Sequence, residues 1–201
     1  MKLIKIIFFL SFIFFTFNSY GSEASNWLKK EIDKILVAYQ APNLSNQNGF
    51  LLIEQTINNN FAGKSIAIHV AKESYKKANK ETRDEYIKLF KRHLALNISS
   101  LMQGYSNQEY KLIDSRYDEK NKVNYVDMEI TLDTGTILVT WRVLKHKERY
   151  FVIDLIISDI SLVETKRSEF NSLLKTFDYN LATFNKKLAS QNESSYKKII
   201  K

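Results

Sequence analysis

YFVIDLIISDISLVETKRSEF, residues 150–170, is the stretch of this 201-residue chain that decides its fold. It begins as a run of apolar residues that would occupy both faces of an extended segment, interrupted only by Asp154. A strand that is apolar on both faces is covered on both sides, or has a cavity on one side. The stretch therefore predicts a buried strand with one acidic side chain in its interior.

The second half of the stretch changes from strand to helix. Ser161 and Glu164 have the spacing of a capping box, which predicts a helix start at this point. Val163, Phe170 and Leu174 then recur at helical spacing. A buried strand that passes through a short turn into an amphipathic helix is therefore the central unit of the predicted fold.

Three more strand-like runs precede this unit. Short polar connections join them, such as the tight turn at Asp133-Thr134-Gly135. Strands that follow one another through short turns form an antiparallel meander. The predicted strands are residues 110–117, 123–132, 136–144 and 150–158.

Helical patterns flank the strands on both sides. The longest covers residues 80–105, is capped by Asn79 and carries a wide apolar stripe. The other predicted helices are residues 26–39, 50–57 and 65–75 before the strands, and 162–176 and 178–188 after them. This order predicts an α+β fold with N-terminal helices, a four-stranded twisted antiparallel sheet and C-terminal helices, which together can enclose an apolar cavity.

The N-terminus has the pattern of a cleavable secretory signal peptide over residues 1–21. Lys2 and Lys5 form its positive region, and residues 6–17 form an apolar core that is short for a membrane-spanning helix. The candidate cleavage residues are Ser19, Gly21 and Ala24. An uncleaved membrane anchor is the alternative interpretation, but we favour export, which predicts a periplasmic location.

The exported part is long enough for one domain, residues 22–189, followed by a basic, flexible tail at residues 190–201. There is no Cys, so packing alone must stabilise the domain. The formal net charge of +8 falls by two when Lys2 and Lys5 are removed. A basic surface favours anionic membranes or acidic partners, although a Lys-rich composition explains the charge equally well. Nucleic-acid binding is not expected of an exported chain.

Sequence motifs for catalysis or metal binding are missing. The three His residues lie far apart, and no HExxH pair, Cys cluster, EF-hand loop or G-x-S-x-G elbow occurs. Asp154 and Arg167 could be read as an acid–base pair. We favour instead a buried ion pair, or hydrogen bonds, that fix the strand-to-helix turn. Neither an enzyme nor a metal site is therefore expected.

The same stretch resembles the C-terminal signature of the MlaC-type, or toluene-tolerance, periplasmic phospholipid-binding proteins. In that signature a strand of the type W-K-V-x-D-V leads into G-V-S-L-V-x-x-Y-R-x-x-F. The matching residues are Asp154, Ser161, Leu162, Val163, Arg167 and Phe170. Tyr150, Asp159 and Lys166 replace the Trp, Gly and Tyr of the pattern, and the loss of Gly bears on the geometry of the turn. The resemblance extends less sharply upstream to about Phe61.

This resemblance implies a periplasmic phospholipid carrier with an MlaC-like fold and an NTF2-like sheet. Such a carrier shuttles lipids between an outer-membrane lipoprotein–porin complex and an inner-membrane ABC transporter with an MCE-domain protein. The transport system maintains the lipid asymmetry of the outer membrane. The implied protein is a monomer without a cofactor, and its bound phospholipid is cargo.

Large apolar residues on the long helix, the sheet and the following helix are the candidates for a lipid-binding pocket. Met suits this role because its side chain adapts to variable acyl chains. The residues alone favour an ordinary filled core, whereas the resemblance favours a pocket lined by some of them. The candidates are Tyr86, Phe90, Leu94, Ile98, Leu101, Met102, Val126, Met128, Ile130, Val139, Trp141, Ile153, Phe170 and Leu174.

Two other classes of protein share this order of elements. An NTF2-like enzyme would need polar catalytic groups that converge in the cavity, and only Asp154 and His93 are candidates. A binder of another small hydrophobic molecule is a further alternative. A structural interaction module of the envelope would have a filled core. The cavity discriminates between them, since it is apolar in a carrier, polar in an enzyme and missing in a structural module.

Overall fold

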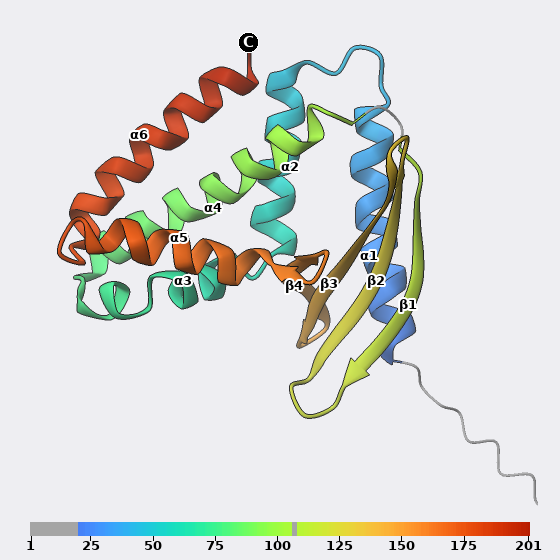
Figure 1. Cartoon of the computed structure of the whole chain (residues 1–201), viewed down its shortest axis with the longest axis horizontal. Helices are drawn as coiled ribbons and strands as arrows, with labels where there is room; N and C mark the ends of the chain where they lie inside the picture. The colour runs from blue at the N-terminus through green and yellow to red at the C-terminus, as the bar shows by residue number, and fades with distance from the viewer. Residues whose placement is uncertain (1–19, 106–107) are drawn as a thin grey trace, which may run out of the picture.

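The computed structural model describes residues 20–105 and 108–201, which form six helices and one five-stranded sheet (Figure 1). The helices are α1 (Tyr20–Tyr39), α2 (Asn46–Asn60), α3 (Gly63–Lys77), α4 (Lys80–Met102), α5 (Leu162–Lys175) and α6 (Leu181–Ile199). The strands are β1 (Tyr110–Asp118), β2 (Val123–Leu132), β3 (Gly135–His146), β4 (Arg149–Ile157) and β5 (Ile160–Ser161). The expected α+β class is confirmed. The predicted signal peptide falls on residues 1–19, outside the described part, and on the first two residues of α1.

The sheet is an antiparallel meander in the order β1-β2-β3-β4-β5, with one strand more than predicted. The additional strand β5 exists because Ser158 and Asp159 both have positive φ, 47° and 66°. Positive φ at two successive residues makes a tight hairpin turn, which pairs Ile157 with Ile160. The sequence lacks the usual Asn-Gly signal of such a turn, so the expectation of four strands was wrong.

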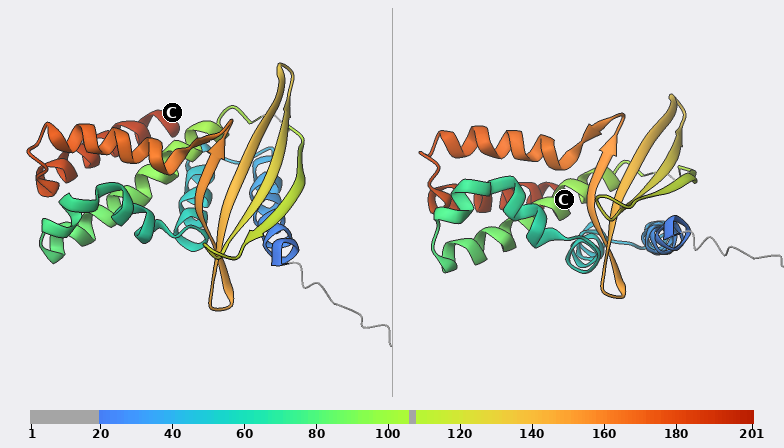
Figure 2. Two further views of the ribbon diagram at one scale, coloured as in Figure 1. Left: turned by 60° about the horizontal axis from the view of Figure 1, so that its bottom comes forward. Right: turned by 90° about the horizontal axis from the view of Figure 1, so that it is seen from below.

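The helices form a lobe beside the sheet as well as a cover for it. Helices α3, α4, α5 and α6 extend away from the sheet on the side of β4, whereas α1 runs along the strands (Figure 1). Figure 2, in the view from below, shows α1 and α2 nearly end-on and on the same side of the sheet. The boundary between lobe and sheet therefore lies at α2, the start of α5 and β4.

Three buried clusters hold these parts together. The helical lobe has an aromatic centre, in which Phe170 meets Phe90 and Phe184 edge-to-face at ring distances of 5.7 and 5.0 Å. A second cluster joins α2 to α4 and α6. A third packs Ala24 and Leu28 of α1 against the inner sides of β2, β3 and β4. Helix α1, and not the long helix α4, thus packs on this face of the sheet.

The predicted helix starts agree with the observed caps. Asn79 accepts a hydrogen bond from the Thr82 N–H at the start of α4, and Ser161 accepts one from the Glu164 N–H at the start of α5. A side-chain oxygen at this position satisfies an N–H that has no partner within the helix. These two starts follow from local chemistry alone.

The expectation of a helix that ends at Leu188, followed by a flexible tail, was wrong. Helix α6 continues to Ile199, and Asn192 and Ile199 are buried. The Asn192 amide donates to the Leu89 carbonyl of α4 at 2.9 Å, and the Tyr196 ring packs on Phe50. Contacts to helices far away in the sequence order this segment. Its polar sequence has no apolar stripe from which these contacts could be predicted.

Candidate functional site

Asp154 organises the junction between β4 and α5. Its carboxylate is only 3 % exposed and accepts hydrogen bonds from Ser161 Oγ at 2.7 Å and from the Val163 N–H at 3.1 Å. Arg142 of the neighbouring strand β3 lies beside it, with Nη1 at 3.4 Å from Oδ2. A buried carboxylate is tolerated when its oxygens are bonded in this way. The acidic residue in the apolar strand therefore locks the start of α5 to the sheet.

Arg167 is not the partner of Asp154. Its guanidinium contacts Glu164 on the same helix, with Nη1 and Oε2 3.2 Å apart. The strand-to-helix junction is instead held by the cross-strand neighbour Arg142 and by the cap itself. The proposed pairing of Asp154 with Arg167 was thus wrong, because the sequence does not reveal that β3 places Arg142 opposite Asp154.

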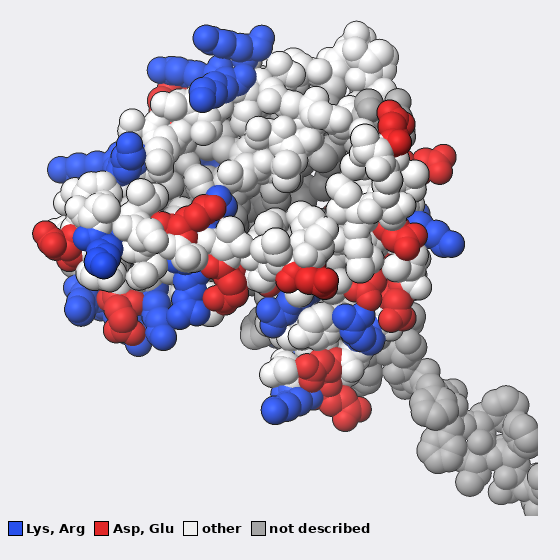
Figure 3. All heavy atoms as spheres, viewed as in Figure 1, with Lys and Arg blue, Asp and Glu red and all other residues white. Residues whose placement is uncertain are grey.

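An apolar cleft of about 370 Å³ opens beside this junction, between α4, the start of α5 and β4. Its volume lies within the range of small-molecule sites. The apolar lining residues are Phe61, Ile66, Phe90, Leu94, Ile98, Leu101, Leu155, Leu162 and Val163, and the polar ones are Asn97, Ser100, Asp154, Thr165, Lys166 and Glu169. Figure 3 shows the area between the helical lobe and the sheet as hollowed and largely free of charged side chains. The cleft is suited to an apolar ligand.

Most of the polar side chains around the cleft have partners within the protein. Lys166 Nζ lies 2.7 Å from Glu169 Oε2, so the two charges at the mouth of the cleft compensate each other. Asn97 donates to the His93 carbonyl, and Thr165 donates to the Ser161 carbonyl. The described residues contain no group of His, Cys, Asp and Glu that could hold a metal ion. This arrangement offers few free groups for acid–base chemistry.

His93 is largely buried between α4, α5 and α6, and its surroundings favour the neutral form of the ring. Burial lowers the pKa of His93, the positive charge of Lys166 lowers it further, and a hydrogen bond to Asn192 raises it. The ring rests against Phe170 with 5.5 Å between the ring centres. Of the two polar candidates for an enzyme, Asp154 is fully used at the junction, and His93 bonds Asn192 through Nδ1 while its Nε2 is buried without a partner.

Four of the predicted pocket residues come together in this cleft: Phe90, Leu94, Ile98 and Leu101, all on one side of α4. Phe90 forms the floor, since it is fully buried, and Leu101 is 70 % exposed at the C-terminal end of the helix. The helical spacing of these residues was the signal that found them.

The other predicted pocket residues lie elsewhere. Tyr86, Phe170 and Leu174 belong to the aromatic centre of the helical lobe, and Met102 packs on the cluster between α2 and α6. Val126 and Trp141 lie in the cluster under α1. The remaining ones, Met128, Val139, Ile130 and Ile153, are buried or half-buried positions of the sheet that do not line the cleft.

Several cleft residues were not predicted. Leu155, Leu162 and Val163 lie in the stretch that decides the fold, and the strand-to-helix switch could have indicated them. Phe61 could not be found in this way, because it reaches the cleft through a single parallel bridge with Val152 that joins the α2–α3 connection to β4. The Ala62 N–H donates to the Val152 carbonyl at 2.9 Å and fixes this contact.

The fold and the cleft together define a class, that of α+β domains with an apolar cleft between a helical lobe and a twisted antiparallel sheet. A family model described as MlaC protein matches residues 29–190. This match covers most of the chain, so the protein belongs to the MlaC family, as the resemblance of residues 150–170 indicated.

A solved structure with the same fold is that of the phospholipid-binding protein from Ralstonia solanacearum in complex with a phospholipid. The similarity covers 86 % of this chain and 98 % of that chain, with a TM-score of 0.75 and 19 % sequence identity. At this identity the comparison establishes the shared fold. A comparison with curated protein sequences gave no match.

Proposed function

We propose that the protein is a phospholipid carrier that holds acyl chains in the cleft between α4, α5 and β4. Family membership supports this proposal, as does the fold shared with a protein whose structure contains a phospholipid. The observation that carries it is the lining of the cleft, where side chains from α4, β4 and α5 are mostly apolar and the charges of Lys166 and Glu169 compensate each other. This lining favours a binding protein over an enzyme.

The energetics of lipid transfer explain why such a cleft suffices. Each buried CH₂ group contributes about 0.8 kcal/mol, so two 16-carbon chains would cost roughly 25 kcal/mol if carried exposed to water. A carrier must offer surroundings about as favourable as the bilayer, so that transfer is nearly balanced. An apolar slot with an open mouth meets this requirement, and the headgroup can remain near the water.

Few backbone contacts directly join the two helices that border the cleft. Helix α5 packs mainly on α3 and β4, whereas α4 packs mainly on α6 and α2. Helix α3 packs on both of them, and Phe90 of α4 contacts Phe170 of α5 within the shared core of the lobe. We propose that a second acyl chain enters by a movement of α5 away from α4.

We further propose that the protein acts in the periplasm as the soluble component of an ABC-type lipid transport system. Its partners would be an inner-membrane MCE-domain protein and an outer-membrane lipoprotein–porin complex, and the system would maintain outer-membrane lipid asymmetry. The family supports this role. None of the described helices is long and apolar enough to cross a membrane.

The test is mass spectrometry of organic extracts from protein that was expressed with its N-terminal segment and purified without detergent. We expect phospholipid at close to one molecule per protein. Leu94→Trp and Ile98→Trp, which fill the cleft, should lower this ratio. The matched control is Val37→Trp, which places the same ring on an exposed position of α1. Protein that stays free of lipid after incubation with phospholipid vesicles would overturn the proposal.

A further inference from the structure

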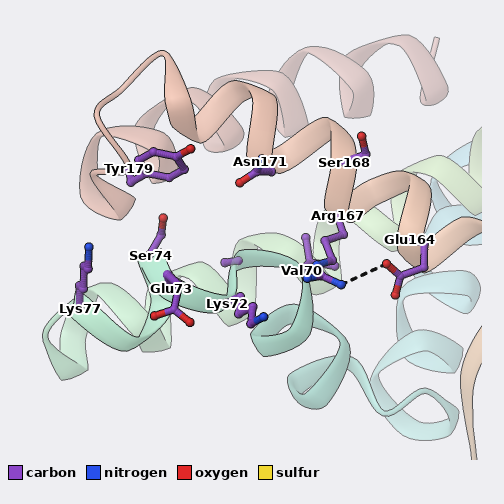
Figure 4. Close-up of a pocket in the computed structure, with 11 residues that line it drawn as sticks. Val70, Lys72, Glu73, Ser74, Lys77, Glu164, Arg167, Ser168, Asn171 and Tyr179 are labelled. Carbon is purple, nitrogen blue, oxygen red and sulfur yellow. Dashed lines mark hydrogen bonds and ion pairs between the residues drawn. The ribbon is translucent and has the colours of Figure 1, made fainter.

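A second cleft lies on the opposite side of α5, and its character is different. It has a volume of about 490 Å³ and lies between α3, α5 and the turn that leads to α6 (Figure 4). Three basic residues, Lys72, Lys77 and Arg167, line it together with Ser74 and Tyr179. None of these residues lines the apolar cleft, so the proposed carrier function leaves them unused.

The acidic residues of this second cleft are already neutralised. Glu73 is paired with Lys76 at 3.0 Å, and this contact is the main cause of its lowered pKa. Glu164 is bound by both His69 at 2.7 Å and Arg167 at 3.2 Å. Within residues 20–105 and 108–201, by contrast, neither Lys72 nor Lys77 forms a salt bridge. Both lysines act on Glu73 only through space, and three basic residues against two acidic ones leave the lining of the cleft with a net positive charge.

Ser74 indicates, independently of the charges, that this cleft can hold a ligand. The residue is 2 % exposed, and its Oγ is buried without a hydrogen-bond partner. Figure 4 shows its hydroxyl directed across the cleft toward Tyr179, with Lys77 beside it and Asn171 above. A buried hydroxyl without a partner is unfavourable, and such groups are normally bonded in folded proteins. The position of this hydroxyl indicates that an oxygen atom of a ligand would serve as its hydrogen-bond partner.

The backbone of α3 is bent at the same place. Lys72 has a φ of 34° in the middle of the helix, a conformation that is strained for a residue with a side chain. The bend divides α3 next to Val70, Ala71 and Ser74, which all line the cleft. Strain of this kind is found at binding sites, where the surrounding structure enforces it.

We propose that this second cleft binds an anion of the phosphate class, a phosphate group that is free or part of an ester. The hydroxyl of Ser74 and the ammonium group of Lys77 would donate to its oxygens, with Asn171 and Tyr179 on the opposite wall. Lys72 would contribute positive charge along the cleft. Phosphate fits because its several acceptor oxygens can receive both a hydroxyl and a charged donor. Its source is either a lipid headgroup or a soluble phosphate ester.

The proposal is tested by calorimetric titration of the purified protein with inorganic phosphate, at an ionic strength kept constant with sodium chloride. Inorganic phosphate has no acyl chain, so a failure here does not bear on the apolar cleft. We expect saturable binding that is weakened about tenfold or more by Ser74→Ala and by Lys77→Gln, since each removes a donor to a charged ligand. Lys64→Gln, an equal charge change on an exposed part of α3, is the control.

Two outcomes would overturn the proposal. The first is a lack of saturable binding, and the second is an equal loss of affinity in Lys64→Gln and Lys77→Gln, which would indicate an unspecific charge effect. Ser74→Ala also keeps the test clear of folding problems, because it removes an unpartnered hydroxyl and should not lower the melting temperature. A Ser74→Ala variant that folds well and binds phosphate as before would also count against the site.

The source of the phosphate is decided by competition. Binding of the protein to phosphatidylglycerol vesicles is measured with and without glycerol 3-phosphate, in the wild type and in Lys77→Gln. Displacement from the vesicles in the wild type, and weak vesicle binding in Lys77→Gln, would assign the cleft to a lipid headgroup. Vesicle binding that neither change affects, together with saturable binding of glycerol 3-phosphate, would assign it to a soluble ester.

Discussion

The two sides of α5 differ in almost every physical respect, although they belong to one short helix. Toward α4 the helix presents Leu162 and Val163 to an apolar cleft, and toward α3 it presents Glu164 and Arg167 to a charged one. Between them, Phe170 and Leu174 are buried in the helical lobe. One helix thus serves two clefts and a core, and each of its faces should respond to mutation in its own way.

The core face should give the largest effect. Phe170→Ala removes a ring that contacts Phe90, His93 and Phe184, and it leaves a cavity between α4, α5 and α6. We expect the free energy of unfolding to fall by about 3–5 kcal/mol, as measured by urea denaturation. A loss below 1 kcal/mol would mean that the lobe is not packed around this ring.

Mutations at the junction between β4 and α5 should have the next largest effect, and this effect should differ between Asp154 and Arg167. Asp154→Ala leaves the Val163 N–H, Ser161 Oγ and Arg142 without their partner, which we expect to cost about 3 kcal/mol of unfolding free energy. Arg167→Ala breaks a pair at the surface and should cost less than about 1 kcal/mol. Equal losses in the two variants would restore the pairing that the sequence suggested.

A mutation in the sheet tests whether the lipid site is limited to the cleft. Met128→Trp overfills a position that is buried but outside the cleft, so we expect a loss of about 1–3 kcal/mol in stability. The lipid-to-protein ratio of the folded fraction, determined by mass spectrometry, should remain that of the wild type. A ratio that falls as in Leu94→Trp would extend the lipid site onto the sheet.

The smallest effect concerns pH. Burial lowers the pKa of His93 in the folded state, so the unfolded state binds a proton more readily. The stability contribution is therefore complete above the ordinary His value of 6.5 and is lost as the pH falls from there toward the lowered folded pKa. We expect the urea midpoint of the wild type to decrease between pH 7 and pH 5.

The matched variant for this effect is His93→Gln, which has no titrating ring and can still bond Asn192. Its urea midpoint should decrease less over the same range, because it has no ring to take up a proton on unfolding. The same pH slope in both proteins would assign the effect to other groups.

The sequence by itself determined the features that depend on neighbouring residues. Alternating and helical patterns gave the meander and most helices, and the capping chemistry of Asn79 and Ser161 gave two helix starts. The stripe on α4 also gave one wall of the cleft, because residues at helical spacing share a face wherever the helix lies.

Only the tertiary structure decided which surfaces meet. It placed Arg142 rather than Arg167 beside Asp154, brought Phe61 into the cleft, and put α1 rather than α4 on the inner face of the sheet. It also ordered α6 as far as Ile199 through contacts to α2 and α4. Local patterns repeat within a few residues, whereas these contacts join residues far apart in the chain. Their existence depends on how whole elements pack, and that information is not carried by any one of the segments involved.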